Sequence, residues 1–168
     1  RGALAMCADE SEAAAIIAHE MAHVIRKHGV QELSKRKVHI KADDAFAELE
    51  EETGAKSADE ADLDDLVHKT YESIVAPRLF AYELEADRFA AVLLAQAGYD
   101  PFGLVRISQK VARIPKDKPG LFDPGYMSPD HLSERAKATE EFVRAHYAET
   151  TNGPRMRERF VERTSGLR

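Results

Sequence analysis

Residues 19–23 read His-Glu-Met-Ala-His and could hold a metal ion and activate a water molecule on it. On a helix, side chains at positions i and i+4 lie on one face, about one turn apart. The imidazoles of His19 and His23 could therefore share one tetrahedral zinc ion, while Glu20 on the adjacent strip could reach a metal-bound water. The alternative is two hydrogen-bonded core histidines beside a surface glutamate. That alternative is disfavoured because an otherwise apolar helix offers such polar groups few partners.

A catalytic zinc ion takes three protein ligands and a water, so one more ligand is needed. Some enzymes extend the pattern along the same helix to H-E-x-x-H-x-x-G-x-x-H. Here Arg26 stands at the glycine position and Gly29 at the final histidine position. The third ligand is therefore expected from another part of the chain.

Two carboxylates in the segment 78–97 offer that ligand. Glu83 and Asp87 are four residues apart, on one face of a strongly apolar helical pattern. Glu83 could coordinate zinc, and Asp87 could accept the second ring N–H of a ligating histidine and fix its tautomer. The competing interpretation is a solvated stripe, but isolated buried carboxylates are costly. We predict Glu83 as the third ligand and expect Glu85 to pair with Arg88 on another side of the helix.

Helical patterns dominate the chain and place both motifs on helices. The first helix is expected from Ser11 to His28, with Ser11 or Asp9 capping its start and Gly29 suited to its end. Its interior is apolar almost all round, which predicts burial. Residues 114–130 contain four prolines and are expected to form a loop. Further helices are expected over 43–53, 57–76, 78–97 and 131–149, after Asp100-Pro101, and after Pro154.

Strand signals are weak, and the expected fold class is mainly α in a single domain over residues 1–168. At most a small edge strand or hairpin is expected, from Arg1 to Cys7 or from Lys37 to Lys41. The chain is 43% hydrophobic and 32% charged, as in soluble globular proteins, and its net charge of -6 gives no sign of a nucleic-acid binder. The longest apolar runs are too short to span a bilayer. Cys7 is the only cysteine, so no disulfide can form within the chain.

Taken together, the two motifs resemble a known family. The sequence is similar to the zinc metallopeptidases that include CAAX prenyl proteases, HtpX-type membrane proteases, Oma-type mitochondrial proteases and BepA-like periplasmic proteases. These form metallopeptidase family forty-eight, of the gluzincin type. The resemblance rests on residues 1–4 leading to Glu12, on Ala-His-Glu-Met-Ala-His-Val at 18–24, on Glu-Leu-Glu-Ala-Asp-Arg at 83–88 and on Gly-Tyr-Asp-Pro at 98–101.

The resemblance implies a zinc-dependent endopeptidase that acts on polypeptides. It implies that His19, His23 and Glu83 bind one zinc ion, that Glu20 is the catalytic base and that Asp87 orients a ligating histidine. The strands that precede the active helix in the family are missing from this sequence, so we expect an N-terminally truncated catalytic domain. The chain is expected to be closest to the soluble, envelope-located members, which implies the periplasm or cell envelope and a role in protein quality control.

A developing oxyanion needs an electropositive partner besides zinc. The candidates are His131, Arg135 and Tyr126, in or just after the proline-rich segment, although each could instead make a structural hydrogen bond. Members of the family commonly carry a His-Pro step and a downstream arginine. In this chain the sequence Ser-Pro-Asp-His at 128–131 lacks that step, whereas Arg135 could fill the arginine position.

The remaining histidines lie at spacings that do not extend the metal set and are expected to be structural or exposed: His28, His39, His68 and His146. Two other functions stay open. One is a zinc-binding module that is proteolytically silent or latent and acts as a chaperone-like adaptor, with His131 filling the open position on zinc. The other is a helical interaction domain without a metal.

Overall fold

The computed structural model describes residues 2–35, 76–117, 128–150 and 154–166, and every regular element in these ranges is a helix. The mainly α fold class is therefore confirmed. The expected helix over 43–53, the expected helix over 57–76 except for its last residue, the alternating segment at 37–41 and Tyr126 lie outside the described residues. In chain order the elements are α1 (Gly2–Met6), α2 (Glu10–Ile25), α5 (Ala76–Gln96), α6 (Phe102–Asp117), α7 (Pro129–Tyr147), the 3-10 helix η3 (Ala148–Thr150) and α8 (Arg157–Thr164).

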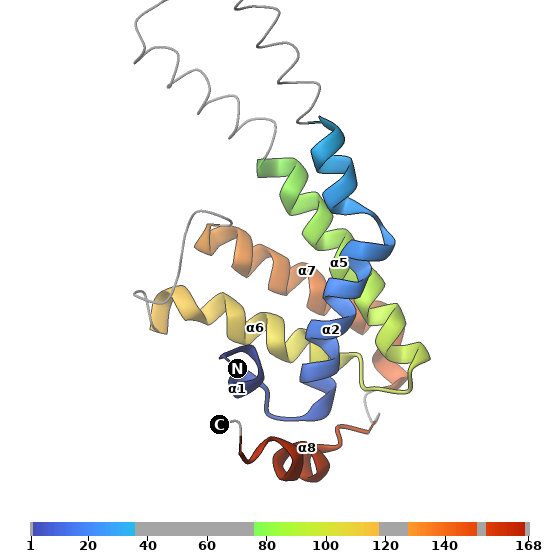
Figure 1. The fold of residues 1–168 in the computed structure, drawn as a ribbon, viewed down its shortest axis with the longest axis vertical. Coiled ribbons are helices and arrows are strands. Elements are labelled where there is room, and N and C mark those ends of the chain that lie inside the picture. Colours follow the sequence, from blue (N-terminus) through green and yellow to red (C-terminus); the bar gives the residue numbers. More distant parts are fainter. Residues whose placement is uncertain (1, 36–75, 118–127, 151–153, 167–168) are drawn as a thin grey trace, which may run out of the picture.

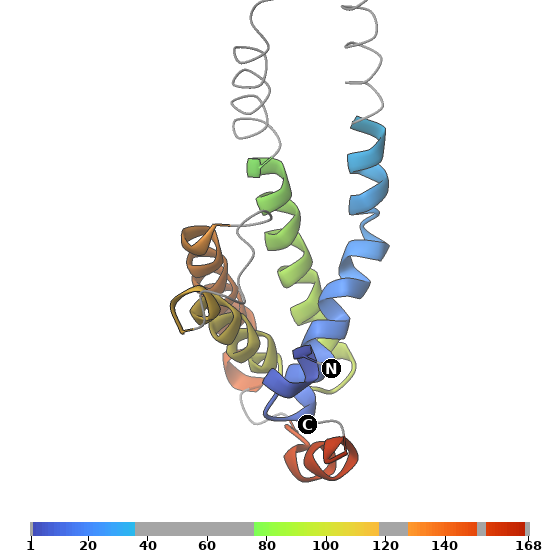
Figure 2. The ribbon, with the colours of Figure 1, turned by 60° about the vertical axis from the view of Figure 1, so that its left-hand side comes forward.

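Two pairs of helices build the body of the protein (Figures 1 and 2). Helix α5 lies along α2, and α6 lies along α7, while α2 also packs against α6 and α5 against α7. The short α8 lies beside the start of α2. The contact between α2 and α5 therefore brings the two sequence motifs face to face. None of the described helices is both long and apolar enough to cross a membrane.

Helix α2 is buried on one side only. Small side chains allow the close approach of α2 and α5, and larger ones from α5, α6, α7 and α8 fill the remaining space. The sequence predicted burial on nearly all sides, and this was wrong for the part of the chain that the structure describes. The buried set includes Ala15, Ala18, Ala90, Ala91, Leu94, Leu104, Val143 and Phe160, whereas the exposed large apolar side chains of α2 are Ile17, Met21, Val24 and Ile25.

The ends of α2 fix where its histidines lie. Asp9 caps the start, because its Oδ1 accepts a hydrogen bond from the Glu12 backbone N–H at 3.1 Å. The helix breaks at Arg26 and Lys27, and Lys27 adopts a φ of 58°. Residues 28–35 are helical again, so Gly29 lies inside a helix and the predicted end at this glycine was wrong. The break turns the chain shortly after the second motif histidine.

Two other sequence expectations were also wrong. Residues Gly2–Met6 form helix α1 instead of an edge strand, in keeping with the high helix propensity of alanine, leucine and methionine. The expected loop over 114–130 was wrong at both ends, because α6 continues through Pro115 to Asp117 and α7 begins at Pro129, while residues 118–127 lie outside the described part of the chain. The start of α6 was predicted correctly, with Asp100 Oδ1 accepting the Phe102 N–H at 3.0 Å.

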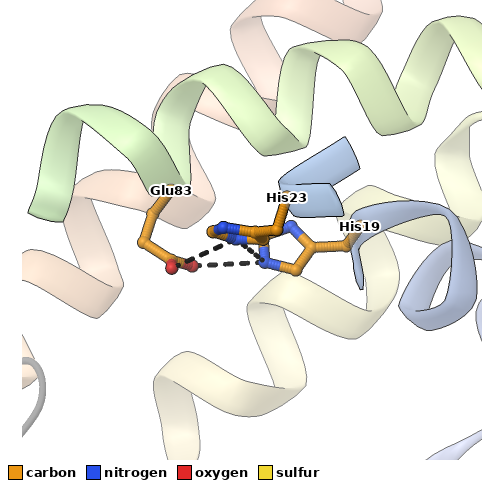
Figure 3. Close-up of side chains that lie close together, drawn as sticks. All are labelled: His19, His23 and Glu83. Carbon is orange, nitrogen blue, oxygen red and sulfur yellow. Dashed lines mark hydrogen bonds and ion pairs between the residues drawn. The ribbon is translucent and has the colours of Figure 1, made fainter. Parts of the chain in front are cut away.

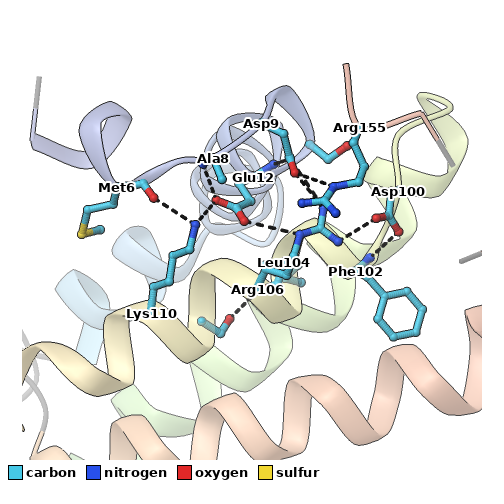
Figure 4. Close-up of polar contacts among 12 residues, drawn as sticks. Met6, Ala8, Asp9, Glu12, Asp100, Phe102, Leu104, Arg106, Lys110 and Arg155 are labelled. Atoms are coloured by element: carbon cyan, nitrogen blue, oxygen red, sulfur yellow. Dashed lines mark hydrogen bonds and ion pairs between the residues drawn. The ribbon is translucent and has the colours of Figure 1, made fainter. Parts of the chain in front are cut away.

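A network of buried charges joins the start of α2 to α6 and to the segment before α8 (Figure 4). Asp9 has no exposed surface, and its Oδ2 accepts from Arg155 Nε at 2.7 Å and lies 3.4 Å from Arg106 Nη2. Glu12, also buried, accepts the Ala8 N–H at 2.7 Å. Burial acts to raise the pKa of Asp9, but the hydrogen bonds from Arg155 and the Glu12 N–H outweigh burial and hold this pKa below its ordinary 3.8.

Replacing Asp9 with asparagine should weaken the fold most at neutral pH. Asparagine keeps the helix cap but removes the charge, and hydrogen bonds to a charged group contribute about 1.5–3 kcal/mol. The folded-state pKa is depressed, so the contribution of the charge is present above pH 3.8 and is lost as pH falls through the folded-state pKa. Denaturant unfolding from pH 7 to pH 3 checks this, with Glu10→Gln as the control for a surface ion pair. Equal destabilisation by Asp9→Asn at both ends of the pH range would contradict the charge argument.

Candidate metal centre

Helix α2 presents two imidazoles on one side of the molecule. His19 and His23 are one turn apart, and their Nε2 atoms lie 3.1 Å from each other (Figure 3). Glu20 follows His19 in the chain, is exposed and lines the same cavity as both histidines. The helical spacing therefore places a carboxylate beside the imidazole pair without inserting it between them.

Helix α5 brings a carboxylate to the same point. Glu83 is 3% exposed, with Oε2 at 3.2 Å from His19 Nε2 and Oε1 at 3.3 Å from His23 Nε2. The three side chains point toward one another (Figure 3), and a ligand atom from each lies within 4.8 Å of the others. The structure thus brings together the three residues that the sequence predicted as ligands.

The chemistry and spacing of these donors fit a zinc ion. Two imidazole nitrogens and one carboxylate oxygen form a known catalytic zinc set, which leaves one position for water. Zinc bonds of about 2.0–2.2 Å in a tetrahedron separate the ligand atoms by about 3.3–3.5 Å. The two imidazole nitrogens are 3.1 Å apart, and each lies 3.2–3.3 Å from a different oxygen of Glu83. With one ligand atom taken from each residue, all separations are within 4.8 Å, so small side-chain adjustments would bring the three atoms to the tetrahedral spacing.

Arg135 from α7 neutralises the two buried carboxylates of α5. Its Nη1 lies 2.7 Å from Glu83 Oε2, while its Nε and Nη2 donate to Asp87 Oδ2 and Oδ1 at 2.6 and 2.8 Å. Thr139, one turn further along α7, donates its hydroxyl to Asp87 Oδ2 at 3.0 Å. This bidentate arrangement explains how α5 carries Glu83 and Asp87 in a protein interior, where unpaired charges are costly.

Asp87 contacts the ring nitrogen of His19 that faces away from Glu83. His19 Nδ1 donates to Asp87 Oδ1 at 2.9 Å. Burial acts to raise the pKa of Asp87, but the hydrogen bonds from Arg135 and His19 outweigh it and hold this pKa at about 2. Burial acts to lower the pKa of His19, yet Asp87 and Glu83 raise it to about 9. A metal ion binding at His19 Nε2 must therefore displace a proton from the metal-free protein.

The second histidine has a different partner, which the sequence interpretation missed. His28 Nδ1 lies 3.0 Å from His23 Nδ1, and His28 Nε2 lies 3.1 Å from Glu85 Oε2. Glu85 also pairs with Arg26, so the prediction that it pairs with Arg88 was wrong. Burial lowers the pKa of His23, which favours the neutral imidazole that a metal ion requires.

The two oxyanion candidates within the described residues lie in different surroundings. Arg135 lines the cavity beside the three predicted ligands. The ring of His131 instead stacks on Phe80, with centroids 4.9 Å apart, and His131 is not part of the group formed by His19, His23 and Glu83. His146 is exposed and stacks on Phe142, as expected for a histidine outside the site.

The cavity in front of these residues has a volume of about 500 Å³ and combines polar and apolar walls. The polar wall is formed by Glu20, the three predicted ligands and Arg135. The apolar part of the lining comes from α1, α2, α6 and the start of α7. Its apolar residues are Ala3, Met6, Ala15, Ile16, Leu104, Ile107, Val111 and Leu132.

Comparison with known protein families agrees with this geometry. The model of peptidase family M48 matches residues 1–160, so the chain belongs to this family of metallopeptidases. Comparison with curated proteins and with solved structures found no match. Family membership identifies the protein as a peptidase and implies a polypeptide substrate.

Proposed function

We propose that this chain is the catalytic part of a zinc-dependent endopeptidase. The observation that carries the proposal is the convergence of His19, His23 and Glu83, with Glu20 beside them, on one wall of a cavity. In this proposal His19, His23 and Glu83 bind the metal ion. Asp87 orients His19 through the hydrogen bond to its Nδ1.

A zinc ion held by His19, His23 and Glu83 would polarise the scissile carbonyl and lower the pKa of its bound water. Glu20 takes the proton of the attacking water and delivers it to the leaving amine. Its exposed position in the cavity wall supports this role, because a base must reach both the water and the substrate. Arg135, which lines the cavity and already pairs with Glu83 and Asp87, and His131 are the two described candidates for stabilising the developing oxyanion.

The shape of the cavity supports a preference among polypeptide substrates. Apolar side chains of α2, α6 and α7 line the same cavity as Glu20 and the predicted ligands. A substrate with a large apolar residue next to the cleaved bond would bury that residue there, gaining roughly 25 cal/mol for each Å² removed from water. An acidic residue at the same position would lose its hydration without a cationic partner on the apolar wall.

Metal removal is the experiment that tests the proposed activity. The purified protein should contain one zinc ion per chain by elemental analysis and should cleave an unfolded protein such as casein. Quenched peptides with leucine or phenylalanine beside the scissile bond should be cleaved faster than the matching aspartate peptide. A chelator should abolish cleavage, and added zinc should restore it. Full activity after complete removal of the metal would refute the proposal.

The same experiment separates the alternative functions. Bound zinc without cleavage of any substrate would favour the silent or latent adaptor, and absence of bound metal would favour a purely structural helical domain. We further propose a location in the cell envelope or periplasm and a role in protein quality control there, on the basis of the resemblance to envelope members of the family. Fractionation of cells that produce the full-length protein tests that location.

A further inference from the structure

His28 is a buried histidine for which the proposed reaction has no direct use. Its side chain is 3% exposed and lies between the break in α2 and helix α5. One face stacks on the ring of Tyr82, with centroids 4.5 Å apart and planes 16° from parallel. Both of its ring nitrogens have polar partners, which are His23 and Glu85.

The contact with His23 exists because of the turn at Arg26 and Lys27. In an uninterrupted α-helix, five residues advance the side-chain direction by about 500°, which leaves His28 about 140° away from His23. The positive φ of Lys27 ends the regular helix and kinks the chain before the next helical segment, and the two rings meet edge to face with centroids 4.9 Å apart. The left-handed conformation is unfavourable for a lysine, so the structure holds this turn at a cost.

The hydrogen-bond directions form one consistent chain from the metal site to the surface. The Nε2 atom of His23 faces Glu83 and His19. A metal ion bound to this atom would therefore leave the ring proton of His23 on Nδ1. That N–H can donate to His28 Nδ1, provided the His28 proton is on Nε2. The Nε2–H group of His28 then donates a hydrogen bond to Glu85 Oε2, and the other oxygen of Glu85 pairs with Arg26. Each N–H in this chain then has one acceptor.

We propose that His28 is a positioning residue that holds His23 in the tautomer and orientation needed to bind a divalent metal ion, with Glu85 and Arg26 fixing His28 in turn. The proposal rests on the proposed metal site. It gives the second histidine a counterpart of the contact that Asp87 makes with the first. The N–H of His23 donates to a ring nitrogen of His28, whereas the N–H of His19 donates to the carboxylate of Asp87. The hydrogen bond of His23 is therefore not charge-assisted, unlike that of His19.

Zinc affinity, measured by competition with a chromogenic chelator, tests this role. His28→Phe keeps the ring volume and the stacking on Tyr82 but removes the acceptor, and it should weaken zinc binding by about 10–100-fold. His28→Asn places an amide oxygen near the position of Nδ1 and should restore most of the affinity. Unchanged zinc affinity in folded His28→Phe, or an equal loss in both variants, would overturn the proposal.

Glu85 provides a second test that does not depend on changes to a buried residue. Its side chain is 39% exposed, so Glu85→Leu should fold, and it should lower zinc affinity several-fold by releasing His28. Adding Glu85→Leu to His28→Phe should cause no further loss of zinc affinity. Additive losses would contradict the proposal that Glu85 acts on His23 through His28. Glu141→Leu, at an exposed carboxylate of α7, is the matched control. Failure of the unaltered protein to bind zinc would refute the proposed function itself, which is a distinguishable outcome.

Discussion

Replacing Glu20 with glutamine is expected to abolish peptide hydrolysis while leaving zinc bound. Glutamine has nearly the same shape but cannot accept the proton of the attacking water, and general-base catalysis contributes about 10²–10⁴-fold to the rate. Zinc content should not change, because Glu20 is exposed and is not part of the group formed by His19, His23 and Glu83. The measurement is kcat on a quenched peptide together with zinc per chain by elemental analysis.

A matched control distinguishes loss of the base from general damage. Glu141 is an exposed carboxylate on α7 that pairs with Lys137, and Glu141→Gln should retain both turnover and zinc. Turnover of Glu20→Gln at the level of the unaltered protein would remove Glu20 from the mechanism. Loss of zinc along with turnover would instead assign Glu20 a part in binding the metal.

The sequence was sufficient to predict which helices carry the site and how its central residues face one another. The spacing of His19 and His23, and of Glu83 and Asp87, is local helical geometry, so the pattern determines which residues share a face. The pairing of α2 with α5 then followed from the need of one zinc ion for three ligands. The structure brings the predicted residues together at one point.

Features that depend on irregular backbone could not be predicted in this way. The contact between His23 and His28 depends on the positive φ of Lys27. Lysine rarely adopts this conformation, and the neighbouring sequence does not predict it. The true partner of Glu85 was missed for the same reason, since Arg26 lies in the same turn. One weak signal was available in the sequence, namely a further histidine, His28, five residues after His23.

Long-range electrostatics formed the other limit of the sequence interpretation. Arg135 was chosen as an oxyanion candidate, but its bidentate contact with Asp87 depends on how α7 packs against α5. The ion pairs of Asp9 with Arg155 and of Asp9 with Arg106 likewise join residues far apart in the chain. Such pairs have no spacing rule, because tertiary packing alone brings their charges together.

Replacing Asp87 with asparagine should weaken both the fold and the metal site. Asp87 is 2% exposed and accepts hydrogen bonds from Arg135, Thr139 and His19. An asparagine amide can replace only part of this set and leaves the guanidinium of Arg135 without one of its carboxylates. Removing one partner of a buried ion pair costs on the order of 3–5 kcal/mol. In the metal-free protein, denaturant unfolding at pH 7 should show a loss of that size.

The pH dependence and the zinc affinity of Asp87→Asn give this prediction two independent checks. The folded-state pKa of Asp87 is about 2 against an ordinary 3.8, so the stabilisation from its charge is present above pH 3.8 and is lost as pH falls through about 2. The difference between Asp87→Asn and the unaltered protein should therefore shrink on acidification. At pH 7, zinc affinity should fall by about 10–100-fold, because His19 loses the acceptor that fixes its ring. A variant with normal zinc affinity but reduced stability would limit Asp87 to a structural role and leave His19 oriented by other contacts.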